Sequence, residues 1–106
     1  MEDDLILKEV VAQAKVVCPE LRKVLLFGSR ARGDATPDSD YDILVVEADP
    51  SLGPKRAAEL RLALWDAPAS FDLVVVGEST FANMLASAIS TTRQLLREAK
   101  VLHAVS

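Results

Sequence analysis

Residues 25 to 46 have the sequence LLFGSRARGDATPDSDYDILVV, and the rest of the chain is best understood from this segment. A first apolar run ends at Gly28-Ser29 and a polar loop follows. A second apolar run begins directly after Asp40 and Asp42. Short continuous apolar runs predict buried strands, here over 24–27 and 41–46. The Gly, Asp, Thr, Pro and Ser residues between them predict a short helical turn over residues 29 to 32 and then a loop.

Asp40 and Asp42 stand at the start of the second predicted strand. Side chains of a strand alternate between its two faces, so residues two apart point the same way. Two carboxylates held this close repel each other and resist burial unless a cation pairs with them. Because carboxylate oxygens are the usual ligands of hard divalent cations, the pair predicts a metal site.

Gly28 and Ser29 lie where the first predicted strand turns into a helical turn. Glycine lets the backbone pass close to a ligand, and Ser29 offers a hydroxyl and an N–H where the helix dipole favours anions. By itself the pair is more typical of an ordinary turn with a serine cap. Beside a metal site it predicts phosphate binding, and phosphate with metal indicates nucleotide chemistry.

A third acidic residue, Asp72, repeats the pattern of Asp42. Each follows an aromatic residue, Phe71 or Tyr41, and each precedes four aliphatic residues. If the two strands are neighbours, Asp72 joins Asp40 and Asp42 on one face. Three carboxylates there could hold two Mg²⁺ ions, as in two-metal nucleotidyl transfer.

Hydrophobic periodicity predicts three longer helices. Their approximate ranges are 3–18, 54–66 and 79–102, the last capped by Ser79 or Thr80 and interrupted near residues 90 to 92. With a third strand over 71–76, the order is helix, strand, strand, helix, strand, helix. This order predicts an α/β fold of the two-layer α+β type, with a small mixed sheet packed against helices.

Size and composition are typical of a single cytoplasmic domain covering residues 1–106. Half of the 106 residues are hydrophobic, which suffices for a core. The net charge of −4 disfavours general nucleic-acid binding, which needs clustered Lys and Arg. A signal-peptide pattern and an apolar stretch of about 20 residues are both absent, so we expect no membrane association. The single cysteine, Cys18, is expected to be a buried thiol in a reducing compartment.

The spaced motif Gly28-Ser29, ten residues, Asp40-x-Asp42 resembles the signature of the minimal nucleotidyltransferases, small members of the DNA polymerase beta-like superfamily. The resemblance covers about residues 24–76, half of the chain. It implies the nucleotidyltransferase fold, which is similar to the palm of polymerase beta. It also implies Mg²⁺-dependent transfer of a nucleoside monophosphate from an NTP, usually AMP from ATP, to an acceptor.

The same resemblance implies roles for individual residues. Asp72 falls where the family places its last carboxylate and would help to deprotonate the acceptor. The catalytic and metal-binding residues would be Asp40, Asp42 and Asp72. The nucleotide-binding residues would be Gly28, Ser29 and Arg30, with Ser29 on the β/γ-phosphates and Arg30 neutralising phosphate charge without a catalytic part.

Many members of this family are encoded beside a helical HEPN-domain toxin RNase, which they bind and adenylylate on tyrosine. The resemblance therefore implies an antitoxin that is a protein adenylyltransferase. An alternative is a non-catalytic partner that neutralises a HEPN-type toxin by complex formation alone. A nucleic-acid-binding accessory protein is disfavoured by the acidic charge. The NTP and the acceptor stay open, and the long apolar stripe of the last predicted helix favours homo-oligomers or hetero-complexes.

Overall fold

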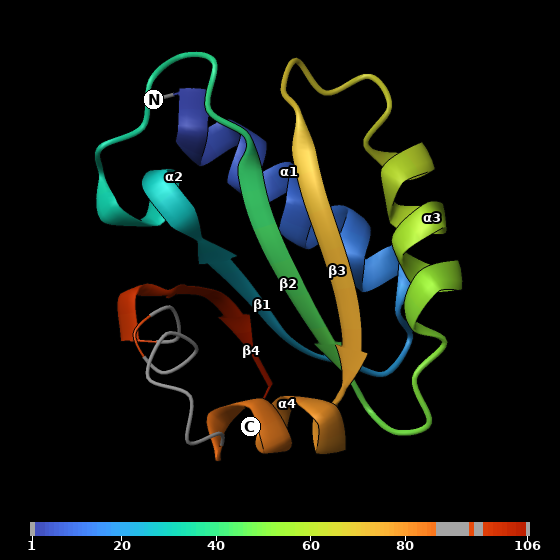
Figure 1. Cartoon of the computed structure of the whole chain (residues 1–106). Coiled ribbons are helices and arrows are strands. Elements are labelled where there is room, and N and C mark those ends of the chain that lie inside the picture. Colours follow the sequence, from blue (N-terminus) through green and yellow to red (C-terminus); the bar gives the residue numbers. More distant parts are fainter. Residues whose placement is uncertain (1, 87–93, 95–96, 106) are drawn as a thin grey trace.

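The protein is described by a computed structural model covering residues 2–86, 94 and 97–105. In this part of the chain, four strands form one sheet in the order β3-β2-β1-β4 (Figure 1). Their bounds are Leu21–Phe27 for β1, Tyr41–Glu47 for β2, Phe71–Gly77 for β3 and Lys100–Ala104 for β4. β2 and β3 are parallel and the other pairs are antiparallel. The predicted mixed sheet is confirmed.

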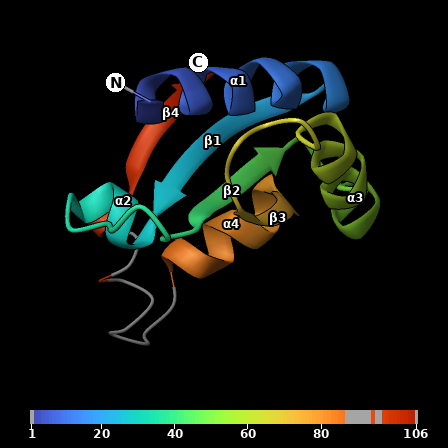
Figure 2. The same ribbon diagram turned by 90° about the horizontal axis from the view of Figure 1, so that it is seen from above.

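Helices pack on both faces of this sheet, as Figure 2 shows from above. The bounds are Glu2–Val17 for α1, Gly28–Arg32 for α2, Gly53–Ala63 for α3 and Glu78–Leu85 for α4. Val10 of α1 and Leu60 of α3 belong to one buried cluster with Val24 and Val45 of the sheet. Phe81 of α4 lies in a second cluster on the opposite face.

The continuous apolar runs of β1 and β2 follow from this two-sided cover. Leu26 and Ile43 pack toward α1 and α3, whereas their neighbours Leu25 and Leu44 pack toward α4. A strand that is buried on both faces needs apolar residues at successive positions. Because Asp42 is two residues before Leu44, its side chain lies on the α4 face.

The C-terminal end of the chain corrects the sequence-based prediction. The apolar stripe predicts helix through Leu102, whereas Lys100–Ala104 forms β4 against β1. Without β4, β1 would have an unpaired edge, and the Val105 N–H donates to the Arg22 carbonyl oxygen at 2.8 Å. This pairing joins segments that are far apart in the sequence, so the local hydrophobic periodicity cannot predict it. The part of the predicted helix over residues 87–93 and 95–96 lies outside the described residues.

The N-terminus of α4 also differs from the prediction. The N-cap is Gly77, and the Ser79 N–H donates to Oδ2 of Asp49 at 3.0 Å, so the capping carboxylate comes from another loop. A Cβ at Gly77 would overlap Oδ1 of Asp49, which explains a glycine at this position. The sequence predicts Ser79 or Thr80 as the cap because Ser and Thr are common N-cap residues. The carboxylate of Asp49 comes from another loop, so it cannot be inferred from the local sequence.

Two further expectations concern single side chains. Cys18 is buried, and burial followed by the charge of Glu47 raises its thiol pKa to about 11, so it is a structural thiol as predicted. Trp65, near the end of the predicted middle helix, is expected to pack, but it is 79% exposed. Among the described residues, none of the helices is long and apolar enough to span a membrane.

Candidate nucleotide and metal site

Asp42 and Asp72 are brought together by the register of the parallel strands. β2 and β3 begin at the same end of the sheet, and Asp42 is the direct partner of Asp72. Side chains of directly paired residues lie on the same face. Asp40 precedes β2 by one residue, two positions before Asp42, at the same end of the sheet. The three carboxylates therefore come from one corner of the fold.

The electrostatics of this corner are unfavourable for Asp42. Burial raises the pKa of its carboxyl above the usual value, the charges of Asp72 and Asp40 raise it further, and the charge of Arg32 acts in the opposite direction. A half-buried carboxylate facing two others is costly unless a cation joins them. The arrangement thus creates a place where positive charge is favourable.

No group of three or more Asp, Glu, His or Cys side chains in the described part of the chain is arranged to hold a metal ion by itself. Asp40 and Asp72 are exposed, and Asp42 is half-buried. Mg²⁺ is usually bound through one or two carboxylates together with substrate phosphates and water, rather than in a cage of protein ligands. The donor set fits an ion that is completed by a phosphate ligand.

Gly28 connects the first strand to this corner. Its φ of +74° is in the left-handed region, and a Cβ at this position would overlap Oδ2 of Asp42. Only glycine meets both demands without strain. The Gly28-Ser29 turn consequently lies directly against the Asp42 carboxylate, so a phosphate held by the turn would be next to a metal held by the carboxylates.

Ser29 is in the first turn of α2 and is half-buried. The N-cap of α2 is Phe27, and this short helix has no side-chain cap among the described residues, so Ser29 is not an ordinary helix cap. The Ser29 carbonyl accepts hydrogen bonds from the N–H groups of Gly33 and Asp34 at 3.0 and 3.1 Å, which close α2.

The two arginines of α2 point in different directions, since helix residues two apart do not share a face. The Arg30 guanidinium lies over the ring of Tyr41, 4.2 Å from its centre, and donates to carbonyls of the following loop. Arg32 lies 3.4 Å from Asp34 and 3.6 Å from Glu98, and its charge lowers the pKa of Asp42. Of the two arginines, Arg32 therefore lies nearer to the carboxylates than Arg30, the one that the family resemblance assigns to the nucleotide.

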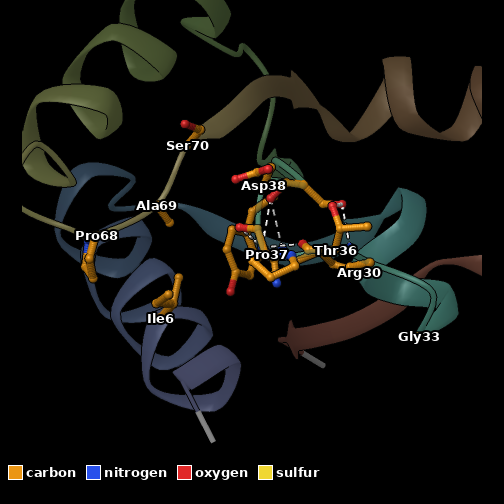
Figure 3. Close-up of a pocket in the computed structure, with 12 residues that line it drawn as sticks. Ile6, Arg30, Gly33, Thr36, Pro37, Asp38, Pro68, Ala69 and Ser70 are labelled. Carbon is orange, nitrogen blue, oxygen red and sulfur yellow. Dashed lines mark hydrogen bonds between the residues drawn. The ribbon is translucent and has the colours of Figure 1, made fainter.

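A pocket of about 750 Å³ lies beside the loop that joins α2 to β2 (Figure 3). Ile6, Arg30, Pro37, Tyr41 and Pro68 are among the residues that line it. Tyr41 belongs to the core under α1, so this pocket is on the face of the sheet opposite the carboxylate of Asp42. The carboxylate corner and this pocket are therefore different places.

Comparisons with known proteins agree with this geometry. The family model for the nucleotidyltransferase domain matches residues 5–101. A curated protein of Methanocaldococcus jannaschii, provisionally named a protein adenylyltransferase, is 62% identical over 26 residues, and this match spans 24% of the chain and 26% of the relative.

Solved structures show the same fold. A toxin-antitoxin structure with AMP-PNP is 25% identical at a TM-score of 0.69, covering 94% of this chain and 74% of the other. A structure of a tri-AMPylated Shewanella oneidensis HEPN toxin with its MNT antitoxin is 22% identical at 0.64, covering 99% and 74%. The predicted fold and family resemblance are confirmed, and the chain belongs to the nucleotidyltransferase domain family.

Proposed function

We propose that the protein transfers AMP from ATP to a hydroxyl group of a partner protein in a Mg²⁺-dependent reaction. The observation that supports this most strongly is the register that sets Asp42 opposite Asp72, beside the Gly28-Ser29 turn. A solved relative contains AMP-PNP, and another contains an AMPylated HEPN toxin, which favours an adenine nucleotide and a protein acceptor.

The nucleotide is held at two neighbouring places. The Gly28-Ser29 turn contacts the β- and γ-phosphates, and the positive charge of Arg32 lies nearby. Asp40, Asp42 and Asp72 are the residues that would hold Mg²⁺. When bound, Mg²⁺ would neutralise phosphate charge and make the α-phosphorus more susceptible to attack.

Transfer itself is a displacement at the α-phosphorus. The acceptor oxygen forms a bond to this phosphorus while the bond to the oxygen bridging the α- and β-phosphates breaks, and pyrophosphate leaves. The hydroxyl proton passes to the carboxylate of Asp72. Asp72 is exposed at the start of the edge strand β3, so a large acceptor can approach it from solvent.

A HEPN-type toxin is the partner that we propose, with a tyrosine hydroxyl as acceptor, on the example of the solved toxin-antitoxin complexes. Neutralisation then follows from modification of the toxin. The alternative is neutralisation by complex formation alone, which would not need the carboxylates.

Mass spectrometry tests the proposal directly. A HEPN partner is incubated with Mg-ATP and either the wild-type protein or Asp42→Asn, and peptides are searched for an added AMP. We expect AMP on the partner with the wild type and none with the variant. If the wild type adds no AMP and an Asp40→Ala/Asp42→Ala protein still neutralises the toxin, binding alone is the function.

A further inference from the structure

We propose that Arg30 is a positioning residue that fixes the backbone on both sides of Asp40, and that it does not act by contacting the nucleotide. The inference rests on the proposed function, because the position of Asp40 matters to activity only if this carboxylate binds metal.

Asp40 needs such support because of where it lies. It is exposed and precedes β2, so it is outside the paired part of the strand. The preceding residues form a turn in which the Ser39 N–H donates to the Thr36 carbonyl at 3.0 Å. The Thr36 N–H donates back to Oγ of Ser39 at 2.9 Å. The turn is ordered locally, but these bonds do not attach it to the sheet.

Arg30 makes that attachment on the N-terminal side of Asp40. Its Nε and Nη2 both donate to the Ser39 carbonyl, at 3.1 and 2.9 Å. The same Nη2 lies 3.3 Å from the Thr36 carbonyl and 3.4 Å from that of Pro37. One guanidinium therefore contacts several carbonyls of the turn, including that of Ser39 in the peptide bond to Asp40. Figure 3 shows Arg30 beside Thr36 and Pro37.

Tyr41 fixes the other side of Asp40 and is itself in contact with Arg30. The Arg30 Cζ lies 4.2 Å from the centre of the Tyr41 ring, and Tyr41 is buried. The Tyr41 N–H donates to the Ser70 carbonyl at 2.9 Å, which joins the starts of β2 and β3. Residues 39 and 41 are thus both held by one side chain, and Asp40 is between them.

The chemistry requires arginine rather than any cation. A planar guanidinium can direct two N–H groups at one carbonyl oxygen while its face lies over a ring, whereas the ammonium of lysine cannot do both. Arg30→Lys therefore keeps the charge and loses the geometry. A residue that merely neutralised phosphate would tolerate this change much better.

The experiment compares Arg30→Lys with Arg61→Lys, a matched change on the exposed surface of α3. Hydrogen exchange of residues 33–41 and the affinity for AMP-PNP, with Mg²⁺ and in EDTA, are measured for both and for the wild type. For Arg30→Lys we expect exchange about 10-fold faster or more. We expect the Mg²⁺-dependent gain in affinity to fall about 10- to 100-fold, as for other supports of metal ligands, with the affinity in EDTA unchanged. Arg61→Lys should match the wild type.

Each other outcome is informative. Wild-type exchange and binding in Arg30→Lys would overturn the inference, as would an equal loss of affinity with Mg²⁺ and in EDTA, which indicates phosphate contact. A wild type whose affinity does not depend on Mg²⁺ would refute the proposed function, and loop exchange would still decide whether Arg30 positions the segment. Thermal melting checks folding, and Arg30→Gln replaces Arg30→Lys if that variant is unfolded.

Discussion

The two ends of β2 carry one acidic side chain each, Asp42 and Glu47, and their surroundings are opposite. Glu47 is 3% exposed and fully paired. Its Oε2 accepts from Oγ of Ser51 at 2.7 Å and from the Leu52 N–H at 3.0 Å, and its Oε1 accepts from Nε of Arg56 at 3.3 Å. These bonds tie the loop after β2 to the start of α3, so Glu47 serves the fold.

Asp42 is half-buried beside the carboxylates of Asp72 and Asp40. Asp72 is its partner in the neighbouring strand and Asp40 is two residues away, so its ionised form is disfavoured. A chain selected only for stability would not keep such a cluster at the edge of its core. The half-buried carboxylate beside like charges therefore marks the site, whereas the paired carboxylate of Glu47 marks a structural support.

The largest effect should come from Asp42→Asn. The amide keeps the shape of the side chain and loses the charge that would hold Mg²⁺, so transfer of AMP should fall about 10³-fold, equivalent to about 4 kcal/mol of transition-state stabilisation. Quantifying AMP added to the partner over time measures this loss. Near-normal rates of AMP transfer in the variant would contradict the functional role of Asp42.

Glu47→Gln should have the next largest effect, and it should fall on stability. Removing one charge of a buried pair and upsetting its hydrogen bonds costs about 3 kcal/mol of unfolding free energy. Glu59→Gln is the matched control, because Glu59 also contacts Arg56 but is 43% exposed, and we expect a change within about 0.5 kcal/mol. Urea unfolding distinguishes the two, and equal costs would contradict the structural role of Glu47.

Gly28→Ala probes the contact between the turn and Asp42. Gly33→Ala is its control, since Gly33 has a similar φ of +86° but no heavy atom within 4 Å of the position that a Cβ would take. In both variants the unfolding free energy should fall by about 1 kcal/mol, because alanine is strained in the left-handed backbone conformation. Gly28→Ala should cost about 1 kcal/mol more by urea unfolding, because it must also displace the Asp42 carboxylate. Similar costs for the two variants would show that this contact is unimportant.

The smallest effect should be the dependence of stability on pH. Because the folded state raises the pKa of Asp42, it binds this proton more tightly than the unfolded chain does, so Asp42 lowers stability as pH rises from about 4 through the raised pKa. Asp42→Asn should therefore melt at a higher temperature than the wild type at pH 7, and the difference should shrink toward pH 4. A less stable variant at pH 7 would contradict the assigned direction.

Much of the site could be predicted because its information is local. The strands that begin at Tyr41 and Phe71 have the same pattern, each with an aspartate as its second residue, and both are found where expected. The remaining features depend on distant partners. β4 forms because β1 has a free edge, and Asp49 caps a helix 30 residues away. The contact of Arg30 with Tyr41 depends on how the loop folds back, which no spacing rule describes.

In the proposed site, Asp72 joins Asp40 and Asp42 around a nucleotide-bound Mg²⁺. Isothermal titration with AMP-PNP, in Mg²⁺ and in EDTA, tests it in the wild type and in Asp72→Asn. We predict that the wild type binds at least about 10-fold more tightly with Mg²⁺ and that Asp72→Asn loses most of this gain. An unchanged Mg²⁺-dependent gain in Asp72→Asn would contradict the shared site.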